Sequence, residues 1–119
     1  MNFTRTLFTL TGLAAVLLVA GCGPNRIAKL NSKPQKYDGQ EVTVVGRVID
    51  TRDIPLTKND YYKVTDDTGE LWVLTTRGVA LRGLKYKIKG TYRRPDGSVA
   101  GVLLGDYIVQ EHKREEVRE

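Results

Sequence analysis

Hydrophobic and polar residues alternate most regularly in two stretches of the chain, Gln40–Asp50 and Leu84–Arg93. Alternation with a period of two is typical of a strand that has one buried face. The residues expected to face inward are Val42, Val44, Val48, Leu84, Tyr86, Ile88 and Tyr92. Gly46 and Gly90 each interrupt one of these strands. A glycine inside a strand favours a bend, so we expect the Gly46 strand to serve both sheets of a small barrel.

Two shorter strands are expected on either side of the turn Asp66–Gly69. Asp bonds backbone amides two residues on, and Gly supplies a positive φ. Counting outward from this turn pairs Thr65 with Glu70 and Lys63 with Trp72. The side chains predicted to point inward are Tyr62, Val64, Leu71 and Val73. Those predicted to point outward are Tyr61, Lys63, Trp72 and Leu74.

The remaining segments give weaker signals. A short helix is expected over Asn25–Lys33, with Asn25 as its cap, Pro34 after its end, and an apolar side that plugs one end of the barrel. Pro55 indicates a loop over Thr51–Asn59. The last strand is expected over Ser98–Gln110, bent at Gly105. Residues 111–119 are predicted to be a charged tail in which Val117 is the one candidate core residue.

The N-terminus has the pattern of an export signal. Arg5 is followed by an apolar run, Leu7–Ala20, which is shorter than the ~20 residues that cross a bilayer. The run ends in Val19-Ala20-Gly21-Cys22, which resembles the lipobox of bacterial lipoproteins. The resemblance implies cleavage after Gly21 and a diacylglycerol thioether on Cys22. The alternative is a plain secretory signal with a chance cysteine.

This resemblance sets the expected domains and location. They are a signal peptide at 1–21, the lipidated Cys22 with tether and helix at 22–36, a barrel at 37–110 and the tail at 111–119. The protein would be lipid-anchored outside the cytoplasm, facing the periplasm or exterior, on the cell membrane or the outer membrane. Gly23, rather than Asp, follows the cysteine and favours the outer membrane.

The chain is mildly basic. It has 119 residues and a formal net charge of +5, and loss of residues 1–21 removes only Arg5, which leaves 18 Lys and Arg against 14 Asp and Glu. This balance suits phosphate, acidic lipid headgroups or anionic glycans. Ordinary surface solubility explains it equally well.

Three stretches together resemble an OB-fold, an all-β, five-stranded Greek-key barrel. They are Tyr37–Val48, Val64–Leu71 and Tyr86–Gly90, and the resemblance is to tRNA-anticodon-binding-like and bacterial periplasmic OB-fold proteins. The chain departs from these in lacking a helix between strands three and four, so we expect the Asn25–Lys33 helix to plug the barrel instead. An SH3-like barrel is the alternative fold.

The resemblance implies a ligand face on strands two and three with the flanking loops. The expected face residues are Tyr61, Lys63, Thr65, Trp72 and Leu74. The loops would add Arg52, Lys58, Arg93 and Arg94. Aromatic rings stack on bases or sugars, and cations hold phosphates or acidic sugars. In the alternative interpretation Trp72 belongs to the core or packs on Lys63 as a cross-strand pair.

The sequence therefore predicts a binding module for an envelope protein or glycan. Binding of single-stranded nucleic acid is the first alternative. Haem handling through His112 is the second, because periplasmic haem chaperones carry a His just past the last strand; the residues after His112 depart from their pattern. We expect no enzyme, no cofactor and no metal site; the alternative is a calcium site formed by Asp50, Asp53 and Asp60. The oligomeric state and the ligand stay open.

Overall fold

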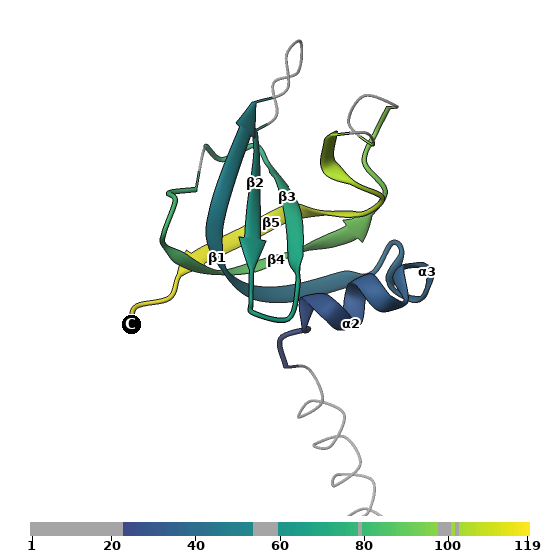
Figure 1. Cartoon of the computed structure of the whole chain (residues 1–119), viewed down its shortest axis with the longest axis horizontal. Helices are drawn as coiled ribbons and strands as arrows, with labels where there is room; N and C mark the ends of the chain where they lie inside the picture. The colour runs from purple at the N-terminus through teal and green to yellow at the C-terminus, as the bar shows by residue number, and fades with distance from the viewer. Residues whose placement is uncertain (1–22, 54–59, 79, 98–100, 102) are drawn as a thin grey trace, which may run out of the picture.

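The computed structural model describes residues 23–53, 60–78, 80–97, 101 and 103–119. Two short helices, α2 (Ile27–Ser32) and α3 (Pro34–Tyr37), precede the strands. The strands are β1 (Glu41–Asp53), β2 (Asp60–Thr65), β3 (Glu70–Thr75), β4 (Lys85–Arg93) and β5 (Ile108–Glu116). Figure 1 shows β1 passing α2 at the lower end of the barrel and then rising beside β2.

The five strands form a closed barrel in the order β1-β2-β3-β5-β4. Neighbours are antiparallel except β3 and β5, which are parallel. Strand β1 pairs with β4 through Glu41–Arg47 and with β2 through Arg47–Asp53. The predicted all-β, five-stranded barrel is confirmed, and one long strand joins its two halves next to Gly46. A Cβ at position 46 would lie 3.0 Å from Val64 Cβ, so glycine permits the close approach.

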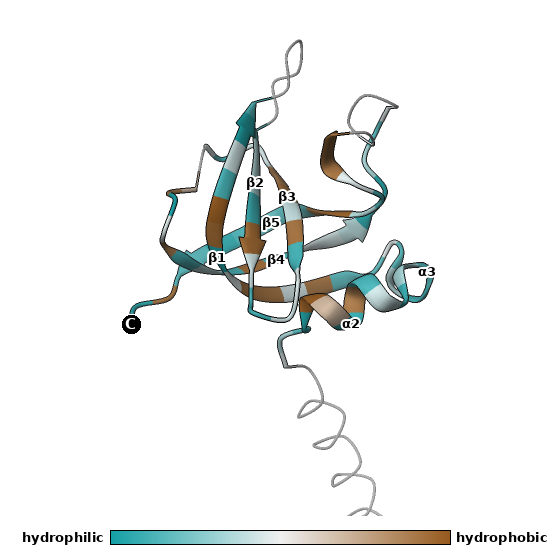
Figure 2. Ribbon diagram, in the orientation of Figure 1, coloured by the Kyte–Doolittle hydropathy of each residue, from teal (hydrophilic) through white to brown (hydrophobic). Residues whose placement is uncertain are grey.

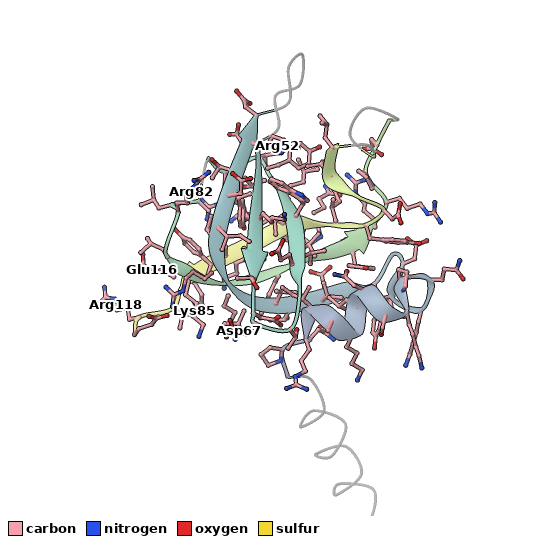
Figure 3. All side chains as sticks on the ribbon, in the orientation of Figure 1. Arg52, Asp67, Arg82, Lys85, Glu116 and Arg118 are labelled. Carbon is pink, nitrogen blue, oxygen red and sulfur yellow. The ribbon has the colours of Figure 1, made fainter. Side chains whose placement is uncertain are left out.

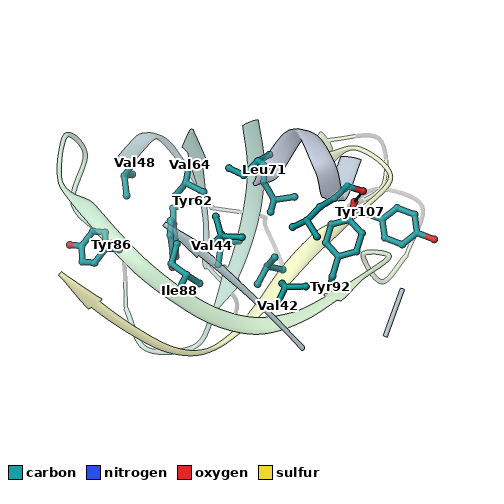
Figure 4. Packing of buried hydrophobic residues seen from close by; sticks show 14 of the residues in the cluster. Val42, Val44, Val48, Tyr62, Val64, Leu71, Tyr86, Ile88, Tyr92 and Tyr107 are labelled. Carbon is teal, nitrogen blue, oxygen red and sulfur yellow. Dashed lines mark hydrogen bonds between the residues drawn. The ribbon is translucent and has the colours of Figure 1, made fainter. Parts of the chain in front are cut away.

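The predicted register of β2 and β3 is confirmed at every pair, including Lys63 with Trp72 and Val64 with Leu71. The inward side chains of both strands are fully or almost fully buried. Figure 4 shows them packed with side chains of β1 and β4. In Figure 2 hydrophobic and hydrophilic residues alternate along β1, as a strand with one buried face requires.

The predicted bounds of the last strand are wrong. Gly105, with φ +87°, lies within the β4–β5 connection, and β5 begins at Ile108 and runs on through residues that are predicted to form a charged tail. Glu111 and Arg114 point inward there. Their burial is possible because the Glu111 carboxylate accepts hydrogen bonds from Tyr62 Oη and Thr75 Oγ1, the latter at 2.7 Å, and lies 3.3 Å from the Arg114 guanidinium.

The N-terminal helix plugs the barrel as predicted, although its bounds and capping differ. Ile27 and Leu30 are fully buried in the main core cluster. Asn25 does not cap α2; its backbone N–H and side-chain oxygen bond the Thr43 carbonyl and amide at 2.6 and 3.1 Å. These bonds satisfy the edge of β1 that β2 leaves free, which explains the position of Asn25. Pro34 ends α2 as expected and also begins α3.

Candidate functional site

The predicted ligand face lies outside the barrel, but its aromatic side chains are covered. Tyr61, Trp72 and Leu74 are 5%, 7% and 6% exposed. They form a second hydrophobic cluster with Leu104 and Ile108, separate from the barrel interior. The expectation of an open face is therefore wrong. The physical reason is that the β4–β5 connection, which was predicted to be strand, folds over these residues and buries them.

Two of the predicted cations, Arg52 and Lys63, lie close to Trp72, and Arg52 also bonds the segment that covers it. The Arg52 guanidinium carbon is 5.1 Å from the Trp72 ring centroid, and Arg52 Nη1 donates to the Leu103 carbonyl at 3.1 Å. Lys63 Nζ lies 5.5 Å from the same centroid and 2.9 Å from Glu70 Oε1. Cations bind aromatic faces electrostatically. Figure 3 shows Arg52 at the upper end of the barrel, away from Lys85.

The other predicted site residues are distributed around this cluster. Arg93 Nε donates to Gln110 Oε1 at 2.8 Å, and the Arg94 guanidinium lies 5.3 Å from the Tyr107 ring centroid. Thr65 Oγ1 donates to the Gly69 carbonyl at 3.0 Å and so belongs to the β2–β3 turn. Lys58 and Cys22 lie outside the described residues. Whether these side chains bind a ligand stays a prediction.

A pocket of about 230 Å³ opens beside Trp72, between the helices, β3 and the β4–β5 connection. We call it the aromatic pocket. Its lining residues are Asn31, Pro34, Glu70, Leu71, Trp72, Tyr92, Leu104, Gly105, Asp106 and Tyr107. The aromatic and aliphatic side chains in this lining are mostly buried, whereas Asn31, Glu70 and Asp106 are exposed at the rim. An apolar floor with a polar rim is the usual composition of a binding site.

The floor of the aromatic pocket is held rigidly. The rings of Tyr92 and Tyr107 stack at 4.9 Å with an interplanar angle of 7°. Tyr92 Oη lies 3.3 Å from the Leu30 carbonyl and 3.2 Å from Asn31 Oδ1. Burial, and to a lesser degree the nearby Tyr107 and Asp106, raises the pKa of Tyr92 to about 12, so its hydroxyl stays protonated at neutral pH. Asn31 Nδ2 donates to the Glu70 carbonyl at 3.1 Å, which fixes the rim.

The residues weighed for metal or haem lie elsewhere. Asp50 Oδ1 is engaged by Arg82 at 2.6 Å, and the described residues contain no group of three or more His, Cys, Asp or Glu that could hold a metal ion. His112 lies within β5 rather than beyond the last strand, so its predicted position is wrong. Its Nε2 is 2.7 Å from Thr91 Oγ1 and 3.5 Å from Glu41 Oε2. The haem role stays a prediction.

The chain matches no known family model and no curated protein sequence. Solved structures do resemble it. An OBody bound to hen egg-white lysozyme superposes with a TM-score of 0.55 and 18% identity, over 71% of this chain and 87% of the OBody. The fold is an OB-fold. The binding face that the OB-fold implies is thus the one that the β4–β5 connection covers.

Two natural OB-fold proteins give similar agreement. A replication protein A heterotrimer bound to single-stranded DNA has a TM-score of 0.51 and 17% identity, with 68% of this chain covered. Asparaginyl-tRNA synthetase from Pyrococcus horikoshii has a TM-score of 0.55 and 17% identity, with 70% covered. The match spans 59% and 20% of those two chains. Among the described residues of this protein, no helix has the length and apolar character needed to cross a bilayer.

Most of the aromatic pocket is not predicted from the sequence. The pattern places Tyr92 in the core and Glu70 at the start of the strand after the Asp66–Gly69 turn, and no predicted site includes Asn31, Asp106 or Tyr107. One signal was present: Gly105-Asp106 is a typical loop pair, and it breaks the last predicted strand just before Tyr107. That the loop meets α2 and β3 depends on tertiary packing alone.

Proposed function

We propose that this protein is a membrane-tethered OB-fold module, lipidated at Cys22 and located outside the cytoplasm, that binds an envelope protein through the aromatic pocket. The observation that carries the proposed binding is the lining of the pocket, which combines buried aromatic rings with exposed carboxylates. The lipid anchor is supported by the Val19–Cys22 pattern, and the OBody bound to lysozyme supports a protein partner by analogy.

The size and charge of the aromatic pocket favour one kind of partner group. Its volume of about 230 Å³ is below the range of small-molecule sites and suits one anchoring side chain. Of the two rim carboxylates, Glu70 is paired with Lys63 at 2.9 Å, so Asp106 is the one that chiefly repels phosphate and attracts a cation. An aromatic wall beside carboxylates binds a guanidinium or ammonium group, as the chain's own Arg94 shows on Tyr107. We therefore propose that a Lys or Arg side chain of the partner enters the pocket.

This geometry gives less support to the nucleic-acid alternative. Nucleic-acid binders of this fold present open aromatic faces on which bases stack. Trp72 and Tyr61 are less than a tenth exposed and are bracketed by Arg52, Lys63 and Leu104. Stacking on them would require displacement of the β4–β5 connection. We propose no catalytic step, because the residues that line the pocket include no nucleophile–base pair.

Photo-crosslinking in the native envelope tests the proposal. A benzoylphenylalanine placed at Pro34, which lines the pocket, should yield a crosslinked adduct, whereas the same group at Glu115, on the outer side of β5, should not yield that adduct. Protease, glycosidase and nuclease digestion of the adduct then identify the partner as protein, glycan or nucleic acid. An adduct removed by glycosidase or nuclease alone would contradict the protein proposal.

Neutralising the rim tests the role of the carboxylates. With the crosslinker at Pro34, the double variant Glu70→Gln/Asp106→Asn should reduce the adduct about tenfold, which corresponds to ~1.4 kcal/mol of binding free energy. The matched control, Glu115→Gln/Glu116→Gln, removes two exposed carboxylates from β5 and should leave the adduct unchanged. Equal loss in both variants would show that general charge, and not the pocket, determines binding.

A further inference from the structure

Four lysines gather on the outer face of the sheet formed by β1, β4 and β5. We call Lys85, Lys87, Lys89 and Lys113 the lysine face. The first three alternate along β4, and Lys87, Lys89 and Lys113 line one shallow depression together with Glu115. None of the four lies within ion-pair distance of a carboxylate in the described part of the chain. Glu115, which lies opposite Lys87 in the β4–β5 register, is the one acid among these residues, so the face keeps a net positive charge.

One cross-strand pair on this face places like charges together. The register of β4 and β5 sets Lys89 directly opposite Lys113. Like charges directly opposite each other on neighbouring strands destabilise a sheet. The isolated domain would gain stability if either residue were neutral or acidic. An anionic counterpart outside the chain would convert this repulsion into attraction.

The start of the domain is bonded to the edge of the same sheet. Asn25 forms both of its bonds with Thr43, and Thr43 pairs with Lys89 in the β1–β4 register. Only Gly23 and Pro24 separate Asn25 from Cys22, so the chain between Cys22 and Asn25 spans at most about 11 Å. This reach is comparable to the Debye length of ~8 Å at physiological ionic strength. A lipid on Cys22 would keep the sheet edge within electrostatic range of the headgroups.

The helices next to the tether add charge of the same sign. Residues 23–37 contain four cations and no Asp or Glu. Those cations, all exposed, are Arg26, Lys29, Lys33 and Lys36. Figure 1 shows the described chain starting at the lower end of the barrel, where α2 and the first half of β1 lie. Basic clusters next to a membrane anchor bind anionic lipid headgroups, at ~1 kcal/mol, or about fivefold in affinity, per Lys or Arg.

We propose that the lysine face docks on the phosphates of anionic lipid headgroups, with the cations of α2 and α3 beside it, so that the barrel has a fixed orientation on the membrane. This inference rests on the proposed anchor at Cys22. The anchor alone would fix only the distance of the domain from the bilayer. The charged face fixes its rotation, which decides the direction in which the aromatic pocket opens.

Lysine acetylation on vesicles tests the docking. The full chain, purified with its lipid, is reconstituted into vesicles of phosphatidylcholine with or without phosphatidylglycerol, and acetylation rates are measured by mass spectrometry. The anionic vesicles should slow acetylation of Lys89 and Lys113 about fivefold, and 1 M salt, with a Debye length of ~3 Å, should abolish the difference. Lys63, on the opposite side of the barrel near Trp72, should react equally on both vesicles. Equal rates for Lys89 on the two vesicles would overturn the proposal.

Charge variants add a matched control. In Lys89→Gln/Lys113→Gln, protection of the remaining Lys85 should be lost, and the urea midpoint should rise because the like-charge pair is gone. The control Arg77→Gln/Arg82→Gln removes the same charge outside the lysine face and should keep Lys85 protected. Loss of protection in both would assign the effect to net charge and overturn the proposal. The urea transition also establishes that each variant is folded.

Failure of the anchor is distinguishable from failure of the docking. A chain that floats with phosphatidylcholine vesicles in 1 M salt is anchored, and unprotected lysines in that chain refute the docking alone. A chain that does not float with those vesicles is not anchored. If its lysines are still protected on anionic vesicles at low salt, docking of the lysine face is supported without the anchor. Protection by a single-stranded oligonucleotide but not by anionic vesicles would assign the face to a different polyanion and refute the membrane proposal.

Discussion

At the scale of single residues, backbone clearance decides where glycine is required. A Cβ at Gly90 would lie 2.1 Å from the Gln110 carbonyl oxygen, beside the register shift between β4 and β5. We expect Gly90→Ala to lower the free energy of unfolding by at least ~3 kcal/mol, because backbone of β5 would have to move. Gly101→Ala, with nothing within 4 Å, is the control and should be neutral or slightly stabilising. Urea denaturation measures both, and equal midpoints would contradict the predicted overlap.

Another residue-scale prediction concerns Glu111, whose side chain is fully buried. Its carboxylate accepts from Tyr62 and Thr75 and pairs with Arg114, and burial followed by the bond to Glu111 raises the pKa of Tyr62. We expect Glu111→Ala to cost ~1–3 kcal/mol, because it leaves the buried Tyr62 and Thr75 hydroxyls without their acceptor. Glu115→Ala, exposed on the same strand, should change stability by no more than ~0.5 kcal/mol. Thermal or urea unfolding of the two variants measures the difference; similar losses would refute the buried network.

At the scale of elements, the β2–β3 turn caps helix α2. Asp66 Oδ2 accepts from the Ile27 amide at 2.9 Å, and Thr68 Oγ1 accepts from the Ala28 amide at 3.1 Å. Partial burial opposes ionisation of Asp66, but the bonds from the Thr68 side chain and from backbone amides outweigh it and lower its pKa. A lowered carboxyl pKa contributes stability above the unfolded value of about 3.9, and this is lost as the pH falls through the folded pKa.

A prediction at the element scale follows from the lowered pKa of Asp66. Asp66→Asn should lower the free energy of unfolding by ~1 kcal/mol at pH 7, since it weakens the cap of α2. At pH 3 the difference from the wild type should shrink, because pH 3 lies below the unfolded pKa of about 3.9, where the stability that the carboxylate contributes is being lost. Asp67→Asn is the control: Asp67 has φ +72°, which Asn tolerates, so the variant should leave the free energy of unfolding at pH 7 unchanged. If the difference in free energy of unfolding between the wild type and Asp66→Asn stays constant from pH 7 to pH 3, the charge of Asp66 does not contribute to stability.

At the scale of the whole molecule, the proposed tether determines where the domain functions. We expect Cys22→Ser to yield an unprocessed precursor or a soluble form, because the thiol is the proposed site of acylation and two acyl chains are needed for stable membrane attachment. Fractionation of the host membranes, with the mass of the product, measures the outcome. If the variant is still cleaved after Gly21 and still sediments with membranes after a salt wash, lipidation at Cys22 is wrong.

The sequence alone determined the barrel and most of its register. Alternation in β1 and β4, the glycines at 46 and 90 and the Asp66–Gly69 turn act through local geometry, so Lys63 opposite Trp72 could be counted from the turn. The same local rules placed Ile27 and Leu30 at the end of the barrel. These features depend on side-chain periodicity and turn chemistry, which are visible directly in the amino-acid sequence.

Which residues are exposed on the surface of the barrel depends on tertiary contacts. Trp72 does point outward as the register requires, but the β4–β5 connection brings Leu104 over it, and no local pattern encodes a contact between segments about 30 residues apart. The sequence predicts that Glu111 belongs to an exposed tail, because charged residues favour solvent. Its burial is possible because it bonds Tyr62 and Thr75, which are distant in sequence, and pairs with Arg114. The aromatic pocket likewise exists only where α2, β3 and this connection meet. Burial of polar groups and closure of loops depend on partners remote in sequence, which periodicity cannot supply.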